Sequence, residues 1–311
     1  MNILVTGGAG FIASHIVDAY IGLGHRVTVI DDLSTGRREN LNAHARFQQL
    51  DIRDAPAVSR LFSEGGFDVV NHHAAQMDVR RSVADPVFDA SVNILGVLTL
   101  LEAAVASGVR RVIFASSGGA IYGEQDYFPA DELHPTRPIS PYGVAKLATE
   151  QYLYYYRAVH GLGAVCLRYA NVFGPRQNPE GEAGVVAIFA SRMLGNGQPV
   201  INGEGTQTRD YVYVADVVRA NVLALGFDGS AVFNVGTGVE TDVNRLFTAL
   251  RSATGAGCRE IHAEAKKGEQ LRSVLDYARI KKELGWAPGV RLDEGIARTV
   301  EFFRSRVAHG A

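Results

Sequence analysis

The sequence predicts an α/β protein built on a doubly wound parallel sheet, and three observations support this fold class. The first half of the 311 residues alternates short apolar segments with longer helical ones. A glycine-rich turn, Thr6-Gly7-Gly8-Ala9-Gly10, follows the first apolar segment, and Asp31 ends the second. Apolar strands separated by helices are typical of a parallel sheet covered on both faces, and a glycine turn after the first strand is typical of doubly wound folds.

The expected elements of the first half follow from its hydrophobic pattern. Apolar runs bounded by turn residues predict strands at 3–6, 26–30, 47–50, 68–72, 112–115 and 164–171. Longer apolar segments with helical periodicity predict helices at 11–24 and around 89–106. This alternation predicts one large sheet domain over residues 1–174.

The pattern changes after residue 174. A Gly/Pro cluster, 174–179, interrupts the alternation, as such clusters do. Beyond it the sequence predicts helices at 184–194, 214–225, 243–253 and 292–304, and short strands at 207–212 and 232–235. We therefore expect a smaller mixed α/β lobe, mainly over residues 175–311, with some segments returning to the sheet.

Composition excludes several classes of protein. A net charge of −2 with 47% hydrophobic residues fits a globular core and excludes a basic nucleic-acid surface. Two cysteines, Cys166 and Cys258, are too few for a disulfide framework, and no cluster has metal-ligand spacing. Without a signal-peptide pattern or a run approaching membrane-spanning length, we expect a cytoplasmic protein with no membrane partner.

The glycine turn predicts a dinucleotide site. Gly7, Gly10 and Ala13 have the spacing Gly-x-x-Gly-x-x-Ala. Such a turn lets the backbone approach a pyrophosphate, while the N-terminus of the following helix supplies N–H donors.

An acid at the end of the second strand sets the cofactor type. Asp31 follows the turn by about 20 residues, the place of an acid that binds the adenosine ribose and disfavours NADP. Asp32 is adjacent, so the assignment between the two stays open. Arg37 and Arg38 leave the preference for NAD over NADP open as well.

A Tyr-x-x-x-Lys pair, Tyr142 and Lys146, predicts hydride-transfer chemistry. On a helix this spacing places both side chains on one face. A free tyrosine has a pKa of about 10, and a nearby ammonium together with a positive nicotinamide ring would lower it. Tyr142 would then take a proton from an alcohol as hydride leaves the same carbon.

A serine at the end of the fifth strand completes the predicted site. The carboxyl ends of parallel strands face the ligand crevice, and Ser116 and Ser117 close this strand. Counting from Phe114 favours Ser117, whereas counting back from Tyr122 lands on Gly118. We predict Ser117 as the proton relay, with Ser116 as the alternative.

Together, these motifs resemble the extended short-chain dehydrogenase/reductase family, most closely its sugar-nucleotide epimerases. The likeness covers nearly the whole chain and includes the stretches 6–12, 31–34, 51–52, 73–75, 116–117, 142–146, 168–177, 209–216, 234–238 and 284–288. It implies a Rossmann fold and NAD-dependent C4 epimerisation of a UDP-hexose through a transient 4-keto sugar, in a homodimer. UDP-galactose/UDP-glucose is the expected pair, and the N-acetylated pair is a further expectation.

The resemblance also implies residue roles. On the cofactor side it implies Gly7, Gly10, Phe11 and Ile12 at the pyrophosphate, Asp31 or Asp32 at the ribose, Asp51 and Ile52 at adenine, and Ala74, Ala75, Asn93, Tyr142 and Lys146 around the nicotinamide. On the substrate side it implies Ser117, Tyr142, Asn171, Val185, Val186, Arg209, Tyr211, Arg272 and Ser273. A guanidinium such as that of Arg209 matches a phosphate.

Several positions depart from the family's pattern. Met77 stands where relatives often have lysine, and residues 266–269 read Lys-Lys-Gly-Glu where they often read Arg-x-Gly-Asp. Which of Lys266 and Arg272 replaces the lost arginine stays open. Ser273 lies where some relatives have a bulky aromatic, so a small serine would leave room for an N-acetyl group.

The residues after the serine separate the epimerases from their siblings. Related dehydratases and decarboxylases carry an acid there, whereas this chain has Gly118 and Gly119. Two alternatives remain: an NAD(P)-dependent sugar-nucleotide dehydrogenase or reductase, which would produce NADH steadily, and an epimerase of UDP-glucuronate.

Overall fold

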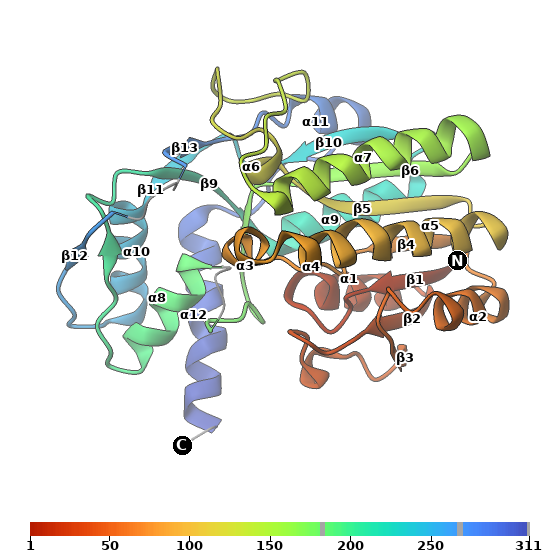
Figure 1. Ribbon diagram of the computed structural model, residues 1–311. Helices are drawn as coiled ribbons and strands as arrows, with labels where there is room; N and C mark the ends of the chain where they lie inside the picture. The colour runs from red at the N-terminus through yellow and green to blue at the C-terminus, as the bar shows by residue number, and fades with distance from the viewer. Residues whose placement is uncertain (181–183, 266–269, 310–311) are drawn as a thin grey trace.

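The computed structural model describes residues 1–180, 184–265 and 270–309. At its centre is a seven-stranded sheet in the order β10-β6-β5-β4-β1-β2-β3 (Figure 1), in which every neighbouring pair is parallel. Its strands are β1 (Asn2–Thr6), β2 (Arg26–Asp31), β3 (Arg46–Gln49), β4 (Val69–His72), β5 (Arg111–Ser117), β6 (Gly163–Tyr169) and β10 (Ala231–Val235). The order β3-β2-β1-β4-β5-β6 is that of a Rossmann sheet, so the predicted doubly wound fold is confirmed.

Helices cover both faces of this sheet. On one face α2 (Ala55–Gly65), α5 (Val97–Ala106) and α7 (Pro141–His160) pack around a core that includes Leu4, Phe62 and Leu153. On the other, α1 (Phe11–Gly22), α9 (Val214–Gly226) and α11 (Ala278–Leu284) pack around one that includes Ile3 and Trp286. Burial of both sheet faces explains why the strands read as apolar runs.

A smaller lobe lies beside one end of the sheet (Figure 1). Its strands are β7 (Asn171–Phe173), β8 (Ile201–Asn202), β9 (Thr208–Tyr213), β11 (Glu240–Asp242), β12 (His262–Ala263) and β13 (Arg272–Ser273). Helices α8 (Val185–Leu194), α10 (Val243–Thr254) and α12 (Leu292–His309) pack around a third core that includes Phe189 and Phe247. Between them, α9 and β10 return to the large sheet, so the chain passes between the two parts more than once.

The long helix expected around 89–106 is interrupted. Helix α4 (Pro86–Ala90) continues through a π-helical turn, η2 (Ser91–Gly96), into α5. Residues 86–106 are also long and apolar enough to cross a membrane by length and composition, so the expectation that no run approaches that length is wrong. The segment packs against α2 and α7 in the folded chain. The remaining short helices are η1 (Arg38–Asn40), α3 (Val79–Ala84) and α6 (Gly118–Ile121).

Candidate active site

The glycine turn between β1 and α1 lies at the carboxyl edge of the sheet. Gly7 has a φ of +70°, and a Cβ there would lie 2.7 Å from the backbone nitrogen of Ala74. Only glycine combines this backbone conformation with so close an approach. Gly10 precedes α1 and provides no side-chain cap, so within the described residues the start of this helix has no capping side chain at that position. Such an N-terminus binds a phosphate group well.

The two aspartates after β2 have different surroundings. Asp31 is buried beside the glycine turn and accepts hydrogen bonds from the backbone nitrogens of Ala9 at 3.0 Å and Leu33 at 2.8 Å. Burial raises the pKa of its carboxyl, and these two bonds oppose the shift. Asp32 is exposed and accepts from the backbone and hydroxyl of Ser34. The position of Asp31 next to the turn favours it over Asp32 as the ribose ligand.

The arginines that left NADP open are engaged elsewhere. Arg37 donates to the side chain of Asn178 at 3.2 Å and lies within ion-pair distance of Glu39. Arg38 donates to Gln49 at 2.8 Å and lies over the ring of Phe47. Both guanidinium groups therefore have partners other than Asp31.

The expected adenine residues follow β3. Asp51 forms an ion pair with Arg53, which lowers the pKa of the aspartate. Ile52 is buried in the core under α2 and α5, where a Cβ on Gly96 would lie 2.7 Å from its side chain. Ile52 is thus a packing residue in the folded chain, whatever it contacts in a complex.

The segment after β4 is fixed by a buried polar set. Thr6 Oγ1 accepts hydrogen bonds from the backbone nitrogens of His73 and Ala74 and lies 2.7 Å from Nδ1 of His72. Burial lowers the pKa of His73 to about 3, so this ring is neutral at pH 7. Both histidine rings have contacts inside the chain: His72 with Thr6, and His73 with the hydroxyl of Tyr169 at 3.1 Å.

Asn93, expected near the nicotinamide, lies in the π-helical turn. Its side chain exchanges hydrogen bonds with the backbone of Gln76 and donates to Asp89 Oδ1 at 2.9 Å. Its backbone oxygen accepts from Thr149 on α7 at 3.2 Å. Asn93 therefore connects the segment after β4, which includes Ala74 and Ala75, with the helix that bears the predicted catalytic pair.

Helix α7 positions that pair. Ser140 caps it by accepting from the backbone nitrogen of Gly143 at 3.2 Å, and Pro141 occupies the first turn. Lys146 is buried; its Nζ donates to the backbone oxygen of Ala115 at 2.9 Å and lies 5.6 Å from the centre of the Tyr142 ring. The two side chains thus share one face of the helix.

The protein's own groups do not lower the pKa of Tyr142. Burial raises it, and the charge of Asp89 acts in the same direction. Burial lowers the pKa of Lys146 to about 8, opposed by the carboxylates of Asp89 and Glu150. The sequence had predicted a lowered tyrosine pKa from the ammonium and the nicotinamide ring together. Within the chain alone, loss of solvation exceeds the attraction of the ammonium.

The two serines at the end of β5 have distinct contacts. Ser116 is buried and donates to Glu150 Oε1 at 2.6 Å. Ser117 begins α6 and accepts from the backbone nitrogen of Ala120 at 3.3 Å; among the described residues its hydroxyl donates to none. Ser117 therefore has a proton to donate where Ser116 does not, which favours the first of the two candidates.

The expected substrate residues come from several elements of the smaller lobe. Arg209 and Tyr211 lie on β9, Asn171 pairs with Tyr211 from β7, and Val185 and Val186 begin α8. Of these, Tyr211 and Val186 are buried and Asn171 is exposed. Asp210, next to Arg209, accepts a hydrogen bond from the hydroxyl of Thr237, and Asp216 accepts one from Arg219.

Residues 272–273 form β13, next to β9. Ser273 is buried, and a Cβ on Gly119 would lie 3.9 Å from its hydroxyl, so Ser273 lies beside α6, the short helix that follows Ser117. Arg272 forms a two-point ion pair with Glu240, at 2.6 and 3.0 Å, and stacks over Phe128. A phosphate contact by Arg272 would have to compete with Glu240. Lys266 and the rest of 266–269 lie outside the described residues.

Sequence reasoning missed three buried charged residues around this site. Asp89, Glu150 and Arg168 are each 5% exposed or less. The resemblance assigns a role to none of them, although Arg168 begins the stretch 168–177, and two of them have a local signal in the sequence. Glu150 lies one helical turn after Lys146, and Arg168 lies inside an apolar strand where a charge needs a partner.

Comparison with known proteins places this geometry in a family. The pattern of the NAD dependent epimerase/dehydratase family matches residues 3–236. UDP-glucose 4-epimerase from Mycolicibacterium smegmatis is 48% identical over 98% of this chain and 99% of its own. A putative UDP-glucose 4-epimerase from Methanocaldococcus jannaschii is 45% identical over 97% and 98%. A dTDP-glucose 4,6-dehydratase from an Actinoplanes species is 36% identical over 98% of each.

Solved structures give the same result. A UDP-glucose 4-epimerase from Thermotoga maritima, with UDP-glucose, has a TM-score of 0.97 at 51% identity and covers 99% of this chain and 100% of its own. The Thermus thermophilus enzyme, with NAD, has a TM-score of 0.93 at 46% identity over 98% and 99%. A UDP-N-acetylglucosamine 4-epimerase from Methanobrevibacter ruminantium has 0.93 at 36% over 98% of each. This chain belongs to the NAD dependent epimerase/dehydratase family.

Proposed function

We propose that this protein is an isomerase that interconverts UDP-galactose and UDP-glucose at C4, through a transient 4-keto sugar, with NAD as resident cofactor. The observation that carries the proposal is the placement of Tyr142 and Lys146 on one face of α7, with Lys146 bonded to the strand that ends in Ser117. The 48% and 51% identical relatives named above act on the same UDP-hexoses and support this substrate.

The residues around the glycine turn fit NAD. The close approach of Gly7 to Ala74 and the uncapped start of α1 form a backbone cradle for the pyrophosphate, and Asp31 would accept from the ribose. We assign this cofactor to the domain of residues 1–174 and the sugar nucleotide mainly to residues 175–311. When bound there, NAD would supply a reversible hydride acceptor for C4 of the sugar.

The chain's own residues move the proton and hold the substrate. Ser117 holds the 4-oxygen by hydrogen bonds, and Tyr142 takes its proton as the 4-keto sugar forms. Lys146 stabilises the tyrosinate through its ammonium and binds the nicotinamide ribose. Tyr142 then returns the proton when hydride is delivered to the opposite face of the turned sugar.

Epimerisation needs the sugar to turn while its anchor stays in place. Arg209 and Tyr211, side by side on β9 with Asn171 across the ladder, would hold the diphosphate and uridine. A guanidinium matches a phosphate with two parallel hydrogen bonds, so it can anchor the diphosphate without contacting the hexose. Val185 and Val186 at the start of α8 would close the nucleotide side.

Dehydration is the main competing reaction, because the 36% identical dehydratase covers the same length. Water elimination needs an acid after the serine, and Gly118 and Gly119 supply none. A Cβ on Gly118 would lie 2.5 Å from the buried side chain of Leu275, so an acid at this position has no room unless Leu275 moves. This packing favours epimerisation.

The deciding experiment uses the purified protein without added NAD. Incubated with UDP-galactose and followed by NMR, it should form UDP-glucose, because the cofactor is regenerated at each turnover. Conversion of only UDP-glucuronate or an N-acetylated substrate would keep the mechanism and change the substrate. Steady NADH production without conversion would favour the dehydrogenase alternative.

Activity on the N-acetylated pair is a further part of the proposal. Ser273 is small, buried and next to Gly119, so it would leave room beside the sugar for an N-acetyl group. The similarity to a UDP-N-acetylglucosamine 4-epimerase supports the extension. Replacement Ser273→Tyr should remove most N-acetyl activity and spare UDP-galactose. Equal loss of both activities, or none, would contradict it.

We also propose a cytoplasmic homodimer formed through α4 and α7. Apolar side chains are exposed along these helices, with Val87 80%, Tyr154 73% and Val159 60% accessible. A hollow of about 430 Å³ lies between α4 and the start of α7. Exposed apolar patches of this kind mark protein interfaces. Light scattering should give twice the chain mass of 33.5 kDa; the single-chain mass would contradict the dimer.

A further inference from the structure

A buried polar cluster lies next to the catalytic pair, and no step of the proposed reaction uses it. We call it the α7–β5 clamp: Ser116, Tyr122, Glu150, Arg168 and Asn234. Each of these residues is 5% exposed or less. Ser116, Arg168 and Asn234 lie in register across β5, β6 and β10, so they share one face of the sheet.

The clamp is fully connected by hydrogen bonds. Arg168 donates from Nε and Nη2 to the two oxygens of Glu150, at 3.0 and 2.6 Å, and Ser116 donates to the same carboxylate at 2.6 Å. Arg168 Nη1 donates to the hydroxyl of Tyr122 at 2.8 Å, and this hydroxyl donates to Asn234 at 2.8 Å. The chain of bonds thus runs from α7 through three strands.

Stability alone is a weak reason for such a cluster. The cost of removing two charges from water offsets most of their attraction, and apolar residues of similar volume often serve as well. What a satisfied polar network adds is a unique geometry, because each bond fixes a direction and a distance. The bonds of the clamp therefore fix how far α7 lies from the end of β5.

Three contacts join α7 to the segment that contains Ser117. A Cβ on Gly143 would lie 2.5 Å from the backbone oxygen of Ala120, Lys146 donates to Ala115, and Glu150 accepts from Ser116. Residues 143, 146 and 150 have the spacing i, i+3, i+7, which is one stripe on a helix. The catalytic helix is thus held against residues 115–120 at three successive heights.

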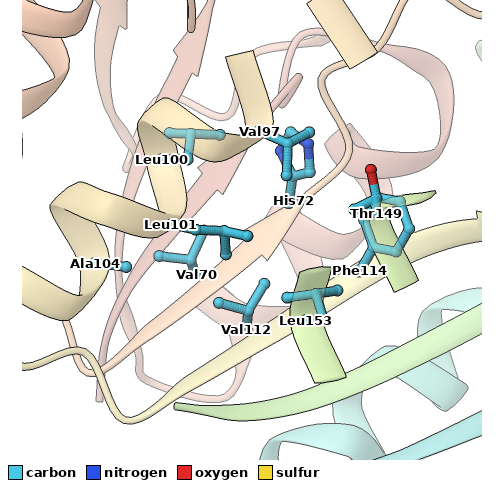
Figure 2. A pocket seen from close by; sticks show the side chains of 10 residues that line it. All are labelled: Val70, His72, Val97, Leu100, Leu101, Ala104, Val112, Phe114, Thr149 and Leu153. Atoms are coloured by element: carbon cyan, nitrogen blue, oxygen red, sulfur yellow. The ribbon is translucent and has the colours of Figure 1, made fainter. Parts of the chain in front are cut away.

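The cavity behind this stripe shows how closely the rest is packed. Figure 2 shows the side chains around it, which come from β4, β5, α5 and α7 and include Phe114, Thr149 and Leu153. Its volume is about 10 Å³, near the lower limit for one water molecule. Apolar contacts of this kind fix no bond direction, whereas the polar bonds of the clamp do.

We propose that Glu150 is a positioning residue for the epimerisation: through Ser116 and Arg168 it holds the end of β5 against α7 and so sets Ser117 relative to Tyr142. The adjacent serines then have different tasks. Ser116 is an anchor whose proton is committed to Glu150, and Ser117 contacts the substrate. This inference rests on the function proposed above.

The test compares two replacements at one position. Ser116→Ala removes one bond to Glu150 and leaves the ion pair intact, so the protein should fold and retain NAD. Its kcat for UDP-galactose should fall about 10- to 100-fold, because small misplacement of reacting groups costs that much, while KM changes less than about twofold. Ser116→Thr keeps the hydroxyl and should restore kcat to near the wild-type value.

Thr299→Val in α12 is the matched control. It also removes a buried hydroxyl, which donates to Gly295 at 2.7 Å, but far from α7, so its kcat should equal that of the wild type. Glu150→Gln is the second variant, expected to lower kcat like Ser116→Ala, with a double variant no worse than the worse single one.

The outcomes separate the two proposals. If the wild type converts UDP-galactose and Ser116→Ala has an unchanged kcat, the clamp is structural and the positioning role is overturned. The same holds if Ser116→Ala loses activity only in proportion to unfolded protein or lost NAD. A wild type without epimerase activity would instead overturn the proposed function, and this inference with it.

Discussion

The cofactor side and the catalytic side of this crevice are built by different means. At the β1–α1 turn the site is formed mainly by the backbone, through the left-handed conformation of Gly7, its close approach to Ala74 and the uncapped start of α1. Between β5 and α7 the site is held by side chains, because Lys146 and Glu150 form hydrogen bonds with the strand that carries the serines. Substitutions at the β1–α1 turn should therefore lower stability and NAD binding, whereas substitutions between β5 and α7 should lower kcat.

The largest effect is expected from Tyr142→Phe on the catalytic side. Loss of the hydroxyl removes the proton acceptor, which should lower kcat about 100- to 10,000-fold with little change in folding or NAD content. Initial rates with UDP-galactose and absorbance of the released NAD check this. Tyr154→Phe on the same helix is the control: Tyr154 is 73% exposed in the single chain, phenylalanine keeps the ring that the proposed dimer would bury, and activity should be retained. Equal losses in both variants would contradict the assignment.

At the β1–α1 turn, Gly7→Ala should lower stability and NAD content, in contrast to the loss of kcat expected for Tyr142→Phe. The added methyl meets Ala74 at 2.7 Å in a left-handed backbone conformation, which should cost roughly 2–4 kcal/mol and most of the bound NAD. Chemical denaturation and NAD content of the purified protein measure both. Gly22→Ala at the end of α1 meets nothing within 4 Å and should gain up to about 1 kcal/mol. A Gly7→Ala protein that is stable and contains NAD would contradict a cofactor site that depends on the backbone of Gly7.

The same difference explains what the sequence could predict. The strand, the turn and Asp31 lie within 31 residues, and each has a local signal in spacing or residue type. The doubly wound sheet follows from such signals repeated along the chain, and its order is the one expected. Local chemistry determines local backbone, so this half of the site was predictable.

The catalytic side was predictable only in its motif. The spacing of Tyr142 and Lys146 identifies them in the sequence. The clamp, by contrast, joins Tyr122 to Asn234 across 112 residues, and no periodic pattern in the sequence relates these two positions. Asp89 lies in a segment that has the pattern of an apolar helix. Burial raises the pKa of Tyr142 and the charge of Asp89 adds to this shift, against the lowering that the sequence predicts. Such long-range pairs depend on the register of the folded sheet, and no local pattern in the sequence shows that register.

The pH dependence of the rate tests this buried charge balance. Lys146 has a pKa lowered to about 8, so it holds its ammonium below pH 8 and loses it above. Since the ammonium stabilises the tyrosinate, kcat should fall above about pH 8, about tenfold per pH unit. The carboxylate of Asp89 favours the ammonium, so Asp89→Asn should move this limb to lower pH. Glu150, His72 and His73 also face the lysine and stay unchanged in this variant.

Stability should show the opposite trend from the same group. A lysine with a lowered pKa binds fewer protons in the folded than in the unfolded state between pH 8 and 10.5. Its contribution to the free energy of unfolding therefore increases with pH across this window. Relative to Lys146→Met, the wild type should become more stable from pH 8 to 10. A constant difference between the two would contradict the lowered pKa.

The smallest effect is expected where neither backbone nor charge is involved, in the cavity behind α7. Val70 on β4 is 2% exposed and lines this cavity of about 10 Å³ (Figure 2). Val70→Ile adds one methylene, which gains at most about 0.8 kcal/mol by burial and loses part of it to crowding. We expect a gain of about 0.5 kcal/mol in denaturation at fixed NAD content, with kcat unchanged. Val83→Ile, at a 62% exposed position, adds the same group without burying it and should change neither quantity. A loss of kcat in Val70→Ile would mean that apolar packing behind α7 also sets the position of the catalytic helix, and the division between a rate-setting polar clamp and a passive core would be wrong.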